Sequence, residues 1–252
     1  MQGWNIFIHS VRMVFGNLGP AVRISGLLYM VYISVHAYYV LNFADDLMEL
    51  QLGMQTELPS GLISTVTLVL VVGLLTNLWI AVLWHRFVLL GQVPETVIPP
   101  LYAGMILTYL GKTILLSLVI VIIIGALDLL LSLALGPMLG PSANMVILLI
   151  LTGVLFYLLY RLGLIFPAVA LGRTMTLKAS WEKTAIASGA IVQLSVIAVF
   201  FVILILISSN MNPDPTSVIN MTYSYVVGWA SMMVGISVLS TLYGIYVEGR
   251  EL

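Results

Sequence analysis

The chain has 252 residues, of which 61% are hydrophobic and 8% are charged, and its formal net charge is −1. Soluble domains are about 45–50% apolar and about 25% charged, so this composition predicts a protein of the lipid bilayer. The small net charge argues against nucleic acid as a partner, and the lack of cysteine excludes disulfides, thiolate nucleophiles and thiolate metal sites.

The first predicted element is an amphipathic helix at 4–19 that lies in the membrane interface. Large apolar side chains recur at helical spacing and form one face, which comprises Trp4, Phe7, Ile8, Val11, Phe15 and Leu18. The opposite face comprises Asn5, His9, Arg12 and Gly16. We expect the apolar face to be buried in the lipid and the polar face to contact water and headgroups.

Six apolar segments follow, each long enough to cross a hydrocarbon core of about 30 Å as a helix of roughly 20 residues. They occupy 24–43, 62–84, 113–135, 144–166, 186–207 and 221–247. No soluble domain is left over. The sequence therefore predicts an all-α, polytopic protein in which 1–252 form a single integral membrane domain.

Charge predicts the orientation of these spans. On the six-span path every cation falls on the side of the N-terminus, namely Arg12, Arg23, Arg86, Lys112, Arg161, Arg173, Lys178, Lys183 and Arg250. The opposite side carries Asp45, Asp46, Glu49, Glu57 and Asp214. Because short cytoplasmic loops are rich in Lys and Arg, we expect both termini to be cytoplasmic.

The basic side has a recurrent pattern. In-plane helices are predicted at 4–19, at 99–110 and at 176–188, each ahead of a transmembrane hairpin, so the six spans form three hairpins. Two spans return to this side through an aromatic residue and an arginine, "WHR" at 84–86 and "LYR" at 159–161. Three structural repeats would explain the pattern. Convergence of every inner loop on aromatic and basic anchors would explain it equally well.

One stretch of the basic side resembles a known family. In "RLGLIFPAVALGRTMTLKASWEKT", 161–184, an arginine near a span end precedes Pro-Ala and a short in-plane helix with a Ser-Trp pair. These residues are Arg161, Pro167, Ala168, Ser180 and Trp181, and "WHRFVLLGQVPE" at 84–95 is similar to the family's other inner loop. The chain resembles the YciC-like bacterial inner-membrane proteins and the membrane domain found ahead of some glycerophosphodiester phosphodiesterases. The resemblance implies a bacterial inner-membrane location and carries over no catalytic residue.

Two ionisable residues, His36 and Asp128, fall well inside predicted spans, where a charge is costly. Both lie roughly 20–24 Å from the basic side at about 1.5 Å per residue, so a buried polar pair is one hypothesis. Alternatively, Asp128 is protonated or reaches water on the acidic side. His36 also lies on an aromatic stripe, as a packing residue or as a ligand of a metal or pigment.

Two further sets of residues are predicted to make contacts in the membrane. Small residues follow one stripe of the last span and favour close helix packing, within the chain or with another protein; they are Ser224, Gly228, Ser231 and Gly235. Cations of the in-plane helices are predicted to bind anionic lipid headgroups; they are Arg173, Lys178, Lys183 and Arg12.

No Gly-rich phosphate loop, HExxH motif or GxSxG motif occurs in the sequence, so we expect no enzyme, and we expect no cofactor or metal. The sequence favours a non-catalytic membrane protein: a structural or accessory subunit of a larger membrane complex, or a membrane organiser. Its partners would be membrane lipids and other integral membrane proteins. The alternative is a small permease for an apolar or zwitterionic solute, with a wet cavity lined by Asn77, Gln193, Asp128 or His36.

Overall fold

A computed structural model describes residues 2–54, 57–211 and 214–251. Within these ranges the chain is helical and contains no strand. The helices are α1 (Gln2–Phe15), α2 (Leu18–Gln51), α3 (Leu62–Leu90), α4 (Ala103–Leu139), η1 (Gly140–Ser142), α5 (Ala143–Leu162), α6 (Ile165–Ala170), α7 (Leu177–Lys183), η2 (Ala185–Ala187), α8 (Ser188–Met211) and α9 (Val218–Tyr246).

Six stretches among the described residues are long and apolar enough to cross a membrane, which confirms the all-α polytopic fold. Two of the differences between these helices and the predicted segments change the architecture. No separate in-plane helix precedes the third span, because α4 runs unbroken from Ala103. The predicted fourth span, 144–166, is interrupted at Gly163, and the short helix α6 follows.

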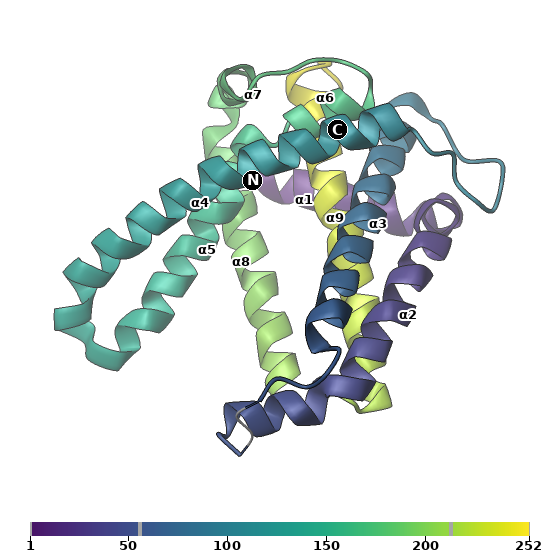
Figure 1. Cartoon of the computed structure of the whole chain (residues 1–252). Coiled ribbons are helices and arrows are strands. Elements are labelled where there is room, and N and C mark those ends of the chain that lie inside the picture. Colours follow the sequence, from purple (N-terminus) through teal and green to yellow (C-terminus); the bar gives the residue numbers. More distant parts are fainter. Residues whose placement is uncertain (1, 55–56, 212–213, 252) are drawn as a thin grey trace.

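Both ends of the chain lie at the same end of the molecule (Figure 1). Arginines from four segments bond to backbone carbonyls there: Arg23 to Pro94, Arg86 to Ala170, Arg161 to Thr184 and Arg250 to Leu89. We call this the basic end, and the end that carries Asp45, Asp46, Glu49 and Asp214 the acidic end.

The six long helices are arranged as two groups of three, which we call the legs. In one leg α2, α3 and α9 pack together, and in the other α5 packs against both α4 and α8. The α4–α5 hairpin diverges from the other leg toward its far end (Figure 1). The two helices of the predicted third hairpin, α8 and α9, belong to different legs in the described part of the chain. Helix α8 packs on α5 and α1, whereas α9 packs on α1, α3 and α6.

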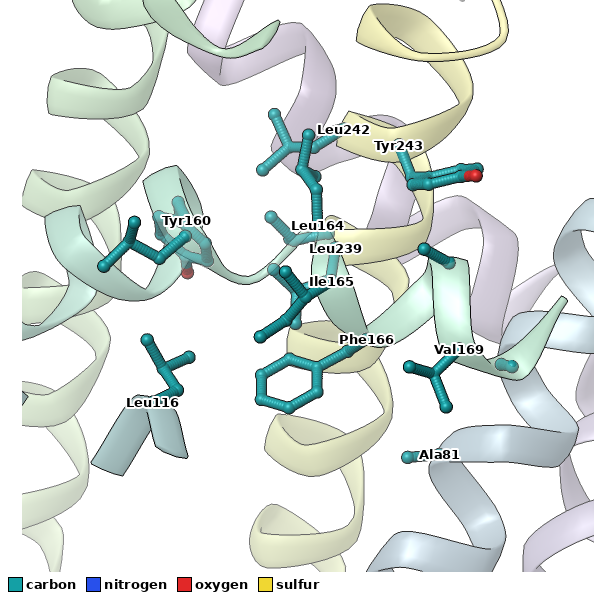
Figure 2. Packing of buried hydrophobic residues seen from close by; sticks show 14 of the residues in the cluster. Ala81, Leu116, Tyr160, Leu164, Ile165, Phe166, Val169, Leu239, Leu242 and Tyr243 are labelled. Carbon is teal, nitrogen blue, oxygen red and sulfur yellow. The ribbon is translucent and has the colours of Figure 1, made fainter. Parts of the chain in front are cut away.

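The two legs are joined at the basic end by α1, α6 and the first turns of α4. Helix α1 contacts both α8 and α9, and α6 contacts α3, α4 and α9. All six residues of α6 are buried. Figure 2 shows Ile165 and Phe166 of α6 beside Leu239 and Leu242 of α9.

Helix α1 packs against the other helices through residues that lie outside its predicted apolar face. Its buried residues are Gly3, Ile6, Ser10 and Val14, whereas Trp4 is 53% and Phe15 47% exposed. A Cβ on Gly3 would lie 2.5 Å from the carbonyl oxygen of Ala190 on α8. Small side chains allow this close approach, and large apolar side chains need no burial when they face lipid.

Candidate functional site

The predicted headgroup-binding cations have different surroundings in the structure. Arg173 donates to Glu248, 2.9 Å away, and to the Tyr243 hydroxyl, 3.4 Å away. The hydrogen bond with Tyr243 and the one with Glu248 raise the pKa of the Arg173 guanidinium. Glu248 also pairs with Arg250, 2.8 Å away. Arg173 thus holds the C-terminal segment against the basic end.

The other three predicted cations are exposed. Lys178 lies 3.8 Å from Glu182, one helical turn away, and both side chains are exposed. Exposed pairs of this kind contribute about 0.3–0.5 kcal/mol to the stability of a helix. Lys183, at the end of α7, and Arg12, on α1, make no ion pair within the described residues. Lys178 and Lys183 share α7, whereas Arg12 lies on another helix.

Arg161, at the end of α5, is buried at 4% exposed although the sequence predicted an arginine that reaches the interface. Its guanidinium donates to the carbonyl of Thr184 at 2.6 Å and lies 4.1 Å from the centre of the Trp181 ring. Its own carbonyl accepts from Ser180 at 2.8 Å. Arg161 therefore clamps α7 onto the end of α5.

The positive charge of Arg161 is incompletely compensated. Its Nε has no hydrogen-bond partner, and no carboxylate lies within ion-pair distance in the described part of the chain. A buried polar group without a partner is costly, and more so when it is charged. The Ser-Trp pair at 180–181, which contacts Arg161, is visible in the sequence. No sequence pattern predicted that Arg161 would be buried.

Arg86, at the end of α3, makes a second clamp of the same kind. It donates to the carbonyl of Ala170, the last residue of α6, at 2.8 Å, and lies 4.4 Å from the centre of the Tyr102 ring. In both clamps an arginine at the end of a span holds a short helix by a carbonyl and stacks on an aromatic ring. This similarity agrees with the matching "WHR" and "LYR" exits.

Two apolar grooves flank the exposed side of α8. One, of about 390 Å³, lies between α5 and α8 and includes Tyr157, Val154 and Val199. The other, of about 490 Å³, lies between α8 and the start of α1 and includes Trp4 and Ile197. Both grooves include Val192 and Val196, which form the ridge between them.

The structure does not bring His36 and Asp128 together. His36 on α2 is half-buried, and its Nδ1 lies 3.1 Å from the Tyr225 hydroxyl of α9. Asp128 lies on α4, in the other leg, and is exposed. Equal depth along two spans does not specify which faces of the helices meet. The aromatic stripe around His36 packs within its leg, where Tyr29 also donates to the Tyr225 carbonyl at 2.9 Å.

The small-residue stripe of α9 is mostly uncovered. Ser224, Gly228 and Ser231 are exposed and Gly235 is half-buried. A Cβ on Gly228 would lie 3.1 Å from the Tyr29 hydroxyl, so α9 approaches α2 closely at this position. Most of the stripe therefore faces the surroundings of the molecule.

A second polar stripe of α9, which no sequence pattern predicted, joins the helices of the basic end. Ser237 accepts from Trp84 at 2.7 Å and donates to Met233, while Thr241 lies 3.1 Å from Ser10. Ser240 lies 2.8 Å from Nδ1 of buried His85, whose Nε2 lies 3.3 Å from the Tyr109 hydroxyl of α4.

Serine–histidine proximity suggests catalysis, but the donor pattern of this pair differs from that of a nucleophile and its base. Ser240 donates its proton to the carbonyl of Ile236 at 3.0 Å. In the tautomer that fits this bond, His85 Nδ1 donates to Ser240 and Nε2 accepts from Tyr109. A catalytic base would instead accept the serine proton. The network joins α3, α4 and α9.

The residues named for a permease cavity do not converge. Asn77 donates to the carbonyl of Gly73 in its own helix at 2.6 Å, and Gln193 accepts from the Gly3 amide at 3.0 Å. His36 bonds to Tyr225, and Asp128 is exposed on α4. The four residues belong to four helices and line neither groove together.

The described residues contain no group of three His, Asp or Glu side chains that could hold a metal ion. No family model, no curated protein and no solved structure matches the chain. The resemblance to the YciC-like proteins therefore stays a prediction.

Proposed function

We propose that this chain is a non-catalytic accessory subunit that binds another integral membrane protein in a bacterial inner membrane, with both termini cytoplasmic. One observation carries the proposal: the two legs pack against each other chiefly at the basic end. Toward the acidic end each leg presents uncovered helix faces, as expected of a protein that completes its packing with other membrane helices.

The exposed faces support lateral binding in two ways. Helix α4 presents large apolar side chains along its length, among them Leu118, Ile122 and Leu133, which are 58%, 71% and 67% exposed. Helix α9 presents Ser224, Gly228 and Ser231. Lipid can cover the first face equally well, but small residues allow the close backbone approach that favours a helix over lipid.

The polar interior supports a role without chemistry. Four buried serines donate to carbonyls of their own helices and also contact polar side chains of neighbouring helices, so their hydroxyls are engaged in helix packing; they are Ser10, Ser25, Ser237 and Ser240. His85 is enclosed between Ser240 and Tyr109, and neither groove reaches it. An active site would need an accessible cavity with convergent polar groups.

Purification in mild detergent after cross-linking in membranes tests the proposal. We expect a second membrane protein in constant stoichiometry. The double variant Ser224→Leu with Ser231→Leu should lose it, because the added bulk blocks close approach. Val226→Phe, on the opposite face of α9, is the matched control and should retain it. A well-folded chain that is recovered without a protein partner under all these conditions would contradict the proposal.

A further inference from the structure

The two grooves and the α7 clamp lie next to one another. Helix α7 ends at Lys183, and α8 begins at Ser188 after the short helix η2. Val192, the first residue of the ridge, lies one turn, or about 6 Å, along α8. Tyr157, in the wall of the α5–α8 groove, contacts the Trp181 ring edge-on at 6.3 Å between centroids. The α5–α8 groove therefore begins beneath α7, and the second groove shares Val192 and Val196 with it along α8.

The walls of the grooves are apolar except at Gln193 in the second groove, whose Oε1 accepts from the Gly3 amide. On α5 they include Ile150, Gly153 and Val154, and on α8 Val192, Val196 and Val199. The hydroxyl of Ser195 is engaged with the carbonyl of Ile191 at 2.9 Å. These surfaces suit hydrocarbon, and two adjacent grooves separated by one ridge suit two chains that leave a common point.

The charge above the grooves is positive. Arg161, Lys178 and Lys183 lie in or against α7, and Glu182 is the carboxylate of the same segment. The buried guanidinium of Arg161 stacks on Trp181 and retains an Nε without a partner in the described residues. An anion at this level would offset the excess of positive charge, whereas a second cation would increase it.

We propose that this corner, formed by α5, α7, α8 and the start of α1, binds one diacyl phospholipid with an anionic headgroup. Its two acyl chains occupy the grooves on either side of Val192 and Val196, and its phosphate lies at the level of Lys183 and Trp181. Indole rings at the membrane interface and lysines near the surface are the groups that meet lipid phosphates. This lipid binds to the chain itself, whether or not a protein partner is present.

Native mass spectrometry of the full chain tests the proposal. The protein is stripped of lipid in detergent and mixed with phosphatidylglycerol, with phosphatidylcholine of the same acyl chains, or with glycerol phosphate. We expect one phosphatidylglycerol per chain, bound at least about five-fold more tightly than phosphatidylcholine, since each basic residue near the surface contributes about a factor of five. Glycerol phosphate should not be retained, because it has no acyl chains.

Two variants separate the headgroup from the chains. Lys183→Gln should weaken phosphatidylglycerol about five-fold and leave phosphatidylcholine unchanged. Val192→Trp with Gly153→Leu should weaken both lipids, because it fills both grooves. Arg23→Gln removes an equal charge from α2, in the other leg, and should change neither. Equal binding of the two lipids, or unchanged phosphatidylglycerol binding in both test variants, would overturn the proposal. None of these measurements involves a protein partner, so failure here is distinct from failure of the proposed function.

Discussion

The guanidinium of Arg161 lies 4.1 Å from the centre of the Trp181 ring and holds α7 on the end of α5. A cation over an indole contributes about 0.5–2 kcal/mol, more when it is shielded from water. Trp181→Ala should lower the free energy of unfolding by about this amount, measured by chemical denaturation in detergent. Arg161→Lys should also destabilise the protein, because an ammonium keeps the charge but loses the planar stack. The exposed pair of Lys178 and Glu182 provides the control, and Lys178→Ala should change stability by less than about 0.5 kcal/mol.

The hydrogen bond between His85 and Ser240 predicts that mutations of the two residues have coupled effects on stability. His85→Ala leaves the Ser240 and Tyr109 hydroxyls short of a partner in a buried site, which costs about 1–3 kcal/mol. Ser240→Ala should be milder. Because the two residues share one hydrogen bond, the double variant should be less unstable than the sum of the single variants. If the losses in unfolding free energy were additive, His85 and Ser240 would not share a hydrogen bond in the folded protein.

The contact of α1 with α8 predicts that the two nearby glycines respond differently. Gly3→Ala places a methyl group 2.5 Å from the Ala190 carbonyl, so α1 must shift and the Gln193 bond to the Gly3 amide is lost. We expect a lower melting temperature and faster proteolysis of the N-terminal segment. At Gly189 a Cβ would meet nothing within 4 Å. Gly189→Ala should therefore be neutral or stabilising, by up to about 1 kcal/mol.

The partner of His36 is a further test. Tyr225→Phe removes the hydroxyl that lies 3.1 Å from His36 Nδ1 and should lower stability by about 0.5–1.5 kcal/mol. Asp128→Asn should have no effect on the melting temperature, because Asp128 lies on the other leg with its side chain exposed. A loss of stability in Asp128→Asn that is equal to that in Tyr225→Phe would restore the pairing that the sequence suggested.

The sequence predicted the spans well because length and apolar composition alone decide whether a helix crosses a membrane. It predicted the basic end because cations converge there. It did not predict which helix faces meet. In lipid, a leucine is equally well placed on a packed face or an exposed one, so hydrophobic periodicity does not indicate which face of a helix packs against its neighbours.

The signals for packing were instead the small polar residues. The spacing of small residues predicts close packing at the stripe of Ser224, Gly228 and Ser231, yet this stripe is exposed. The stripe of Ser237, Ser240 and Thr241, further along α9, is buried and bonded to α1 and α3, and through His85 to α4. Its partners Trp84, His85 and Ser10 lie far away in the chain, so spacing alone could not distinguish the two stripes.

Disulfide trapping tests the division into two legs most directly, and the chain has no cysteine of its own. In proteoliposomes, Gly153→Cys with Val199→Cys should cross-link, because a Cβ at Gly153 would lie 3.8 Å from the Val199 side chain. A series of α8–α9 pairs at matched depth, such as Val202→Cys with Met232→Cys, should stay reduced. If α8–α9 pairs across this depth cross-link as readily as the α5–α8 pair, the six helices form one closed bundle and the divided arrangement is wrong.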